Sequence, residues 1–126
     1  MIKRFIATRM VKTCAFAVLA GMALGSSVIA DGAGTPLTVT LTLKDHRFTP
    51  AAFTVPAGAR VRITLINRDP STEEFDSHDL RIEQVVTPMG KISFNIGPLA
   101  PGQYSFAGEF HAKTAQGRIT AIAAGR

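Results

Sequence analysis

The chain has 126 residues, which is enough for one domain and too few for two. It carries 14 Lys and Arg residues against nine Asp and Glu residues, and its one cysteine excludes an intrachain disulfide. The positive excess lies at the N-terminus, so the net charge of +5 gives no support for nucleic-acid binding, which needs a basic patch on a folded domain.

The first 30 residues have the pattern of a secretory signal peptide. A basic start is followed by an apolar run over residues 15–24, and Val28-Ile29-Ala30 places small or tolerated residues where a signal peptidase cleaves. The apolar run is short and broken by glycine, whereas a membrane-spanning helix needs roughly 20 apolar residues. We therefore expect cleavage before Asp31 and a periplasmic location; a membrane anchor and lipid attachment at Cys14 are the alternatives.

Removal of residues 1–30 changes the charge balance. The remaining chain has ten basic and nine acidic residues, a net charge of +1, and no cysteine. Residues 31–36 form a glycine-containing flexible leader, and residues 37–126 are predicted to form a domain large enough for a modest core without disulfides. No membrane span is expected in this part of the chain.

After the leader, apolar and polar residues alternate with period two, which is typical of half-buried β-strands. The predicted strands cover residues 38–43, 53–55, 61–65, 79–83, 91–96, 104–106 and 118–123, with proline, glycine or asparagine turns between most of them. This spacing predicts an all-β, Greek-key β-sandwich of about seven to eight strands. The only helix expected is a single turn near residues 70–75 or 113–116.

Two polar segments interrupt the alternation, Glu73–Asp79 and Gly108–Lys113. We interpret both as loops, and in a sandwich such loops gather at one end of the two sheets. Phe75 and Phe110 are expected to wall a site between these loops, whereas Phe48, Phe53, Phe94 and Phe106 are assigned to the core.

Three sequence pieces resemble the cupredoxins and together cover nearly all of the predicted domain. They are Phe48-Thr-Pro50 with Phe53–Gly58, the strand of residues 61–67 leading into Glu74-Phe75, and Leu99-Ala-Pro101-Gly102-Gln-Tyr104-Ser-Phe106 followed by His111 and Gly117. Within the cupredoxins, the Glu-Glu-Phe-Asp-Ser and Gly-Glu-Phe-His stretches are similar to those of EfeO-like periplasmic domains. That resemblance implies metal handling beside a high-affinity iron permease.

The resemblance also shows where this chain departs from blue-copper proteins, which bind copper through two histidines, a cysteine and a weak methionine. The cysteine position falls at Gly108, and the second histidine is retained as His111. The first histidine falls at Glu73 or Glu74, and the methionine falls near residues 115–116. Without a thiolate, a type 1 blue copper site and a plastocyanin-like electron carrier are excluded.

The remaining candidate ligands are oxygen and imidazole donors. Glu74, Asp76, Glu109 and His111 are predicted to gather at one end of the sandwich, with His46 approaching from the first strand. Carboxylate and imidazole together suit Fe, Mn, Cu(II) or Zn without strong selectivity. Each residue also has a structural interpretation, because acidic turns and surface histidines are common without a metal.

His78 and Met89 are further candidates, although a hydrogen-bonded core-edge histidine and an exposed turn residue are the favoured interpretations. Tyr104 resembles the tyrosine corner of sandwich folds and is expected to be structural.

Three functions fit this sequence. The favoured one is a periplasmic protein that binds iron or copper and supports an inner-membrane iron-uptake system, with an iron permease as partner. The second is an oxidase that converts ferrous to ferric iron for that permease. The third is a metal-free interaction module on a cupredoxin scaffold.

Overall fold

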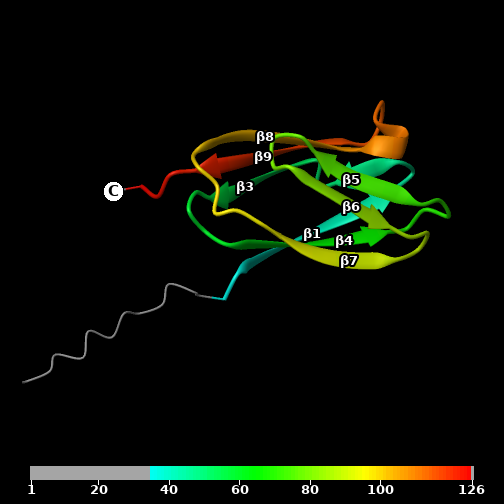
Figure 1. Cartoon of the computed structure of the whole chain (residues 1–126), viewed down its shortest axis with the longest axis horizontal. Helices are drawn as coiled ribbons and strands as arrows, with labels where there is room; N and C mark the ends of the chain where they lie inside the picture. Colours follow the sequence, from blue (N-terminus) through cyan, green and yellow to red (C-terminus); the bar gives the residue numbers. More distant parts are fainter. Residues whose placement is uncertain (1–34, 126) are drawn as a thin grey trace, which may run out of the picture. The chain divides into compact units, whose positions relative to one another are not determined.

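The computed structural model describes residues 35–125, which form two β-sheets packed face to face (Figure 1). Nine strands and one short 3-10 helix lie in this part of the chain. They are β1 (Leu37–Lys44), β2 (Arg47–Thr49), β3 (Ala52–Pro56), β4 (Val61–Asn67), β5 (Glu73–Ser77), β6 (Ile82–Val86), β7 (Lys91–Ile96), β8 (Gly102–Gly108), η1 (Glu109–His111) and β9 (Gln116–Ile122). The all-β sandwich expected from the sequence is confirmed. The proposed signal peptide lies outside the described residues.

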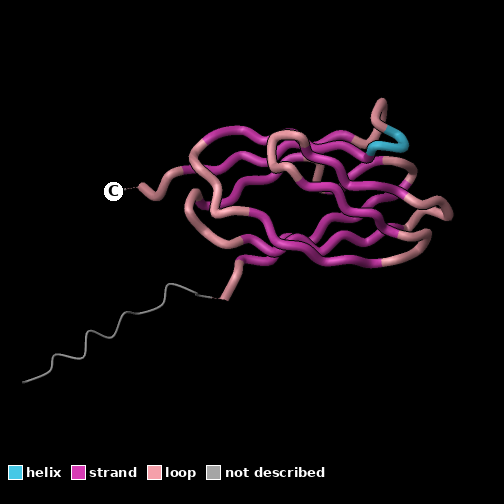
Figure 2. The backbone as a smooth tube through the Cα atoms, viewed as in Figure 1, coloured by secondary structure: helices cyan, strands magenta, loops and turns pink. Residues whose placement is uncertain are grey.

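One sheet has the strand order β2-β1-β4-β7 and the other β3-β9-β8-β5-β6. β1 runs parallel to β4 and β3 runs parallel to β9, and the other pairs are antiparallel. The tube in Figure 2 shows that loops join the strands at both ends of the sandwich, with η1 at one end. Within residues 35–125 no helix is long and apolar enough to cross a membrane.

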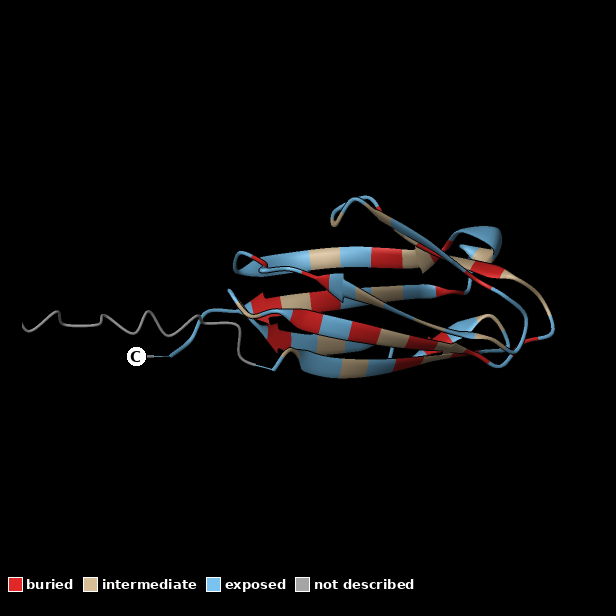
Figure 3. Cartoon of the chain, turned by 60° about the horizontal axis from the view of Figure 1, so that its bottom comes forward, coloured by how far each residue is buried: buried red, intermediate tan, exposed pale blue. Residues whose placement is uncertain are grey.

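The alternation of buried and exposed residues follows the strands (Figure 3). In β4, Val61, Ile63 and Leu65 are fully buried, whereas the intervening Arg62 is exposed. Because successive side chains of a strand point to opposite faces, this pattern turns one face of each sheet toward the other. The period-two sequence pattern therefore gives the layer structure directly.

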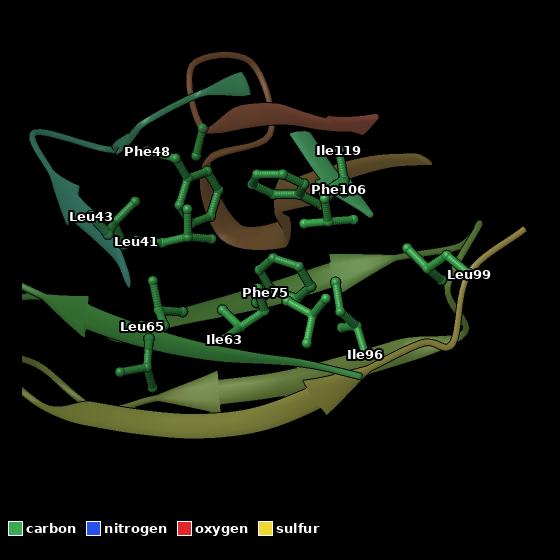
Figure 4. Close-up of a cluster of buried hydrophobic side chains, with 14 of the residues drawn as sticks. Leu41, Leu43, Phe48, Ile63, Leu65, Phe75, Ile96, Leu99, Phe106 and Ile119 are labelled. Atoms are coloured by element: carbon green, nitrogen blue, oxygen red, sulfur yellow. The ribbon is translucent and has the colours of Figure 1, made fainter. Parts of the chain in front are cut away.

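Aromatic rings fill the space between the sheets (Figure 4). Phe75 is fully buried, and its ring centroid lies 5.0 Å from that of Phe106 and 4.9 Å from that of Phe94. Phe48 packs edge-on against Phe106 at 5.1 Å. Phe75 thus lies in the core, and the expectation that it walls a loop site is wrong.

The expectation that Glu73–Asp79 is a loop is also wrong, because residues 73–77 form β5. The inward-facing residues of this strand are Glu73, Phe75 and Ser77. Two of the three are polar, so the strand lacks the apolar alternation by which the others were found. The helical turn lies at Glu109–His111 rather than at residues 70–75 or 113–116.

The predicted tyrosine corner is present. The Tyr104 hydroxyl donates a hydrogen bond to the carbonyl of Ala100, four residues upstream, at 2.7 Å. This bond ties the start of β8 to the loop before it.

We predict that Phe75→Ala lowers the free energy of unfolding by about 3–5 kcal/mol, because it removes the ring at the centre of the aromatic core. Urea denaturation of the purified protein measures this change. Val85→Ala, at a position that is 55% exposed, is the control and should change stability by about 0.5 kcal/mol or less. Equal losses for the two variants would contradict this assignment of the core.

Candidate metal centre

Two histidines and a glutamate converge at one end of the sandwich. Ligand atoms of His46, Glu73 and His111, one from each residue, all lie within 4.8 Å of one another. His46 lies in the turn between β1 and β2, Glu73 is the first residue of β5, and His111 is the last residue of η1. We call these three residues the His–Glu–His cluster. In Figure 1, η1 lies at the end of the sandwich toward which β1 runs.

Glu73 is the most buried member of the cluster, with 1% of its surface exposed. One carboxylate oxygen, Oε1, accepts hydrogen bonds from the backbone amides of Glu74 at 3.0 Å and Phe110 at 2.9 Å. The other, Oε2, lies 2.6 Å from Nδ1 of His111. Each oxygen therefore has a partner, as a buried carboxylate requires.

The two imidazole rings stack on each other. The ring centroids of His46 and His111 are 3.6 Å apart, with 12° between the ring planes. Nδ1 of His46 is buried and has no hydrogen-bond partner, and the nearest carboxylate oxygen, Oδ2 of Asp69, is 3.5 Å away. A buried ring nitrogen without a partner is costly unless a further group satisfies it.

A short closed loop holds His111 over Glu73. The amide of Gly108 donates to the carbonyl of Ala115 at 2.8 Å, and the amide of Ala115 donates to the carbonyl of His111 at 2.9 Å. These bonds close the loop that carries η1 and fix it at the end of β8.

The donor set of the cluster fits a divalent transition metal. Two imidazole nitrogens and one carboxylate oxygen form a set that binds Fe(II), Cu(II) or Zn(II). Thiolate is absent from residues 35–125, since the only cysteine is Cys14. A thiolate–copper centre therefore does not fit the described residues.

The side chain of Glu73 fills the space beside Gly108, the residue at which the resemblance to the cupredoxins puts their cysteine. A Cβ atom added to Gly108 would lie 2.8 Å from Cδ of Glu73 and 2.8 Å from Cβ of Ala115. Carbon atoms pack at about 3.5–4.0 Å, so any larger residue at 108 must displace one of these neighbours. Gly108 thus makes room for the carboxylate.

Of the five predicted ligands, the structure brings His46 and His111 together and leaves Glu74, Asp76 and Glu109 outside the cluster. Glu74 and Asp76 alternate with the inward-facing residues of β5 and are only partly buried, and Glu109 is exposed. The weaker candidates His78 and Met89 are exposed and also lie outside the cluster.

Glu74 instead faces other acidic groups. Partial burial raises the pKa of its carboxyl group, and the negative charges of Glu83, Asp76 and Glu109 raise it further. Phe110, expected to wall the site, contributes its backbone amide while its side chain is 53% exposed.

Glu73 belongs to the cluster, whereas the sequence analysis favoured the adjacent Glu74 as the ligand. The signal that could have identified Glu73 is the alternation of inward-facing and outward-facing residues along a strand. Glu73 shares the parity of the core residue Phe75, so it faces inward once residues 73–77 are recognised as a strand.

The match to a family model decides the family. Residues 14–121 match the family described as "Cupredoxin-like domain". The chain belongs to the cupredoxin-like domain family. This cupredoxin-like chain is also 45% identical over 83 residues to the uncharacterized protein RP394 of Rickettsia prowazekii (strain Madrid E). That match spans 66% of this chain and 66% of the relative, just under two thirds of either length.

Solved structures with the same fold include copper proteins. The metal-binding domain of the Cu(I)-exporting P-type ATPase CopA of Streptococcus pneumoniae D39 has a TM-score of 0.61 and 17% identity, over 68% of this chain and 84% of that domain. Auracyanin A, a "blue" copper protein of Chloroflexus aurantiacus, has a TM-score of 0.60 and 14% identity, over 69% and 99% of the two chains. At these identities the likeness shows the cupredoxin fold alone.

We predict that Gly108→Ala lowers the free energy of unfolding by about 1–3 kcal/mol, because the new methyl group overlaps Glu73 and Ala115. Thermal or urea unfolding measures the loss. Gly125→Ala is the control, since nothing lies within 4 Å of a Cβ atom built there. A Gly108→Ala variant as stable as the Gly125→Ala variant would show that the Glu73 side chain does not occupy this space.

Proposed function

We propose that this cupredoxin-like protein is a periplasmic binding protein for iron or copper that supports an inner-membrane iron-uptake system. The observation that carries the proposal is the convergence of His46, Glu73 and His111 within 4.8 Å around a buried carboxylate. Buried ionised groups are rare unless they are paired or bind metals, and here the carboxylate faces two imidazoles.

The ligand chemistry favours a divalent ion over Cu(I). Cu(I) prefers soft sulfur ligands, and the cluster offers only nitrogen and oxygen. Two histidines and one carboxylate also form the ligand set of non-haem Fe(II) sites, in which coordination positions stay open for further ligands. The cluster therefore suits Fe(II) or Cu(II) bound with water or a partner's groups.

Copper and iron must be distinguished by more than affinity. A nitrogen and oxygen site binds Cu(II) more tightly than Fe(II) in a test tube, whatever metal it holds in the cell. Copper is supported by fold neighbours that bind it, and iron by the resemblance of the two polar segments to EfeO-like domains. The signal-like pattern of residues 1–30 supports a periplasmic location for either role, and the resemblance to EfeO-like domains supports an inner-membrane permease as the partner.

The first test is a calorimetric titration of the purified protein with Cu(II) and, in the absence of oxygen, with Fe(II). We predict one ion bound per chain and at least about tenfold weaker binding in His46→Ala, Glu73→Gln and His111→Ala. Glu74→Gln is the matched control, because it makes the same change one residue along β5, outside the cluster. His78→Ala controls for loss of an exposed histidine.

Two results would contradict this assignment. If Glu74→Gln weakened metal binding as much as Glu73→Gln, the binding site would have to include the outer face of β5. No binding of either ion by a folded protein would leave the metal-free interaction module as the remaining function.

The iron-uptake role has its own test. We expect periplasmic extracts of cells that contain the tagged chain to yield protein loaded with iron, and cells without the chain to grow more slowly when iron is scarce. The Glu73→Gln variant should not restore growth, whereas Glu74→Gln should. Copper-loaded protein with normal growth in scarce iron would assign the chain to copper instead. Oxygen-dependent loss of Fe(II) above the rate in buffer would favour the oxidase.

A further inference from the structure

The turn that carries His46 has an uncommon backbone conformation. Asp45 and His46 are the two residues between β1 and β2, and both have positive φ angles, 50° and 55°. Two-residue hairpin turns of this kind favour glycine, asparagine and aspartate, so Asp45 suits its position, whereas His46 carries a β-carbon where glycine is preferred. A histidine at this position needs support from outside the hairpin.

Asp69 supplies that support from a distant part of the chain. Its Oδ1 atom accepts a hydrogen bond from the amide of Asp45 at 2.7 Å, and its Oδ2 atom accepts one from the amide of His46 at 2.9 Å. Both turn amides are thus held by one carboxylate that is only 3% exposed. Burial raises the pKa of Asp69, but these amides and the charges of His46 and Lys44 outweigh burial and lower it overall, which keeps the group ionised.

Asp69 is itself fixed in place. Its amide donates to Oδ1 of Asn67 at 3.0 Å, and its carbonyl accepts from the amide of Met89 at 3.1 Å. The buried Asn67 side chain donates in turn to the carbonyls of Ser71 and Thr87 at 2.8 and 3.1 Å. The carboxylate is therefore anchored to the end of β4 and to the turn between β6 and β7.

We infer that Asp69 is a positioning residue for the proposed metal centre. Its carboxylate holds the β1–β2 turn so that the His46 ring stacks on His111 and faces Glu73. This inference rests on the proposed function of the His–Glu–His cluster. Asp69 acts through His46 and is not itself one of the converging ligands. Residues of this kind behind a metal-bound histidine change metal affinity about 10–100-fold when they are removed.

The test compares Asp69→Ala and Asp69→Asn with the wild-type full chain by Cu(II) titration and by electron paramagnetic resonance. Asp69→Ala should weaken Cu(II) binding about 10–100-fold and reduce the number of coordinated imidazole nitrogens from two to one. Asp69→Asn keeps one carbonyl oxygen as an acceptor for the turn and should lose less.

A double-mutant cycle separates positioning from general damage. If Asp69 acts only through His46, Asp69→Ala should have little further effect on Cu(II) affinity once His46→Ala is present. Asp45→Gly, which accepts the left-handed conformation without strain, should partly restore Cu(II) binding to Asp69→Ala. If Asp69→Ala does not fold, the same cycle is run with Asp69→Asn.

The inference is overturned if Asp69→Ala retains wild-type Cu(II) affinity and both nitrogens. It is also overturned if the loss of affinity is the same with and without His46, because Asp69 would then act on the fold in general. Wild-type protein that binds no Cu(II) would refute the proposed function itself. Binding that depends on His46 and Glu73 but not on Asp69 would refute only the positioning role.

Discussion

The carboxylate of Glu73 is removed from water, so protein groups must satisfy both of its oxygens, and this requirement organises the end of the sandwich around it. The amides of Glu74 and Phe110 bind one oxygen, and the ring of His111 binds the other. One buried group thereby fixes the start of β5, the short helix η1 and the orientation of an imidazole. Hydrogen bonds to a charged acceptor are stronger than those between neutral groups, which suits this carboxylate to an organising role.

The residues of the His–Glu–His cluster come from both layers of the fold. Glu73 belongs to the five-stranded sheet and His111 to the connection between its strands β8 and β9, whereas His46 comes from the hairpin at the edge of the four-stranded sheet. The stacked rings of His46 and His111, with centroids 3.6 Å apart, make a direct contact between the two layers. A cupredoxin framework thus holds nitrogen and oxygen side-chain groups together at one end, with His111 from the loop after β8 and His46 from the first hairpin.

Most of the fold follows from the alternation of apolar and polar residues, because that pattern reports directly which face of a strand is buried. β5 was missed because its inward positions include Glu73 and Ser77, whose burial depends on distant partners. For the same reason Glu74 was predicted as a ligand in place of Glu73, and Asp76 was included in the expected site. His111 was found through the family motif and His46 through its place after the first strand. The role of Asp69 depends on contacts across more than 20 residues of sequence, which no local pattern encodes.

The tight fit between Gly108 and Glu73 bears on how such a centre can arise in evolution. A cysteine at 108, where the resemblance to blue-copper proteins puts their thiolate, would need the volume that the Glu73 carboxylate occupies in this chain. A single change at either position leaves a clash or an unfilled space, so the two positions are epistatic. A lineage that moves between the two ligand sets must pass through a less stable intermediate or change both residues together. The free energy of unfolding contributed by the rest of the sandwich then decides whether the less stable intermediate still folds and the ligand set can change.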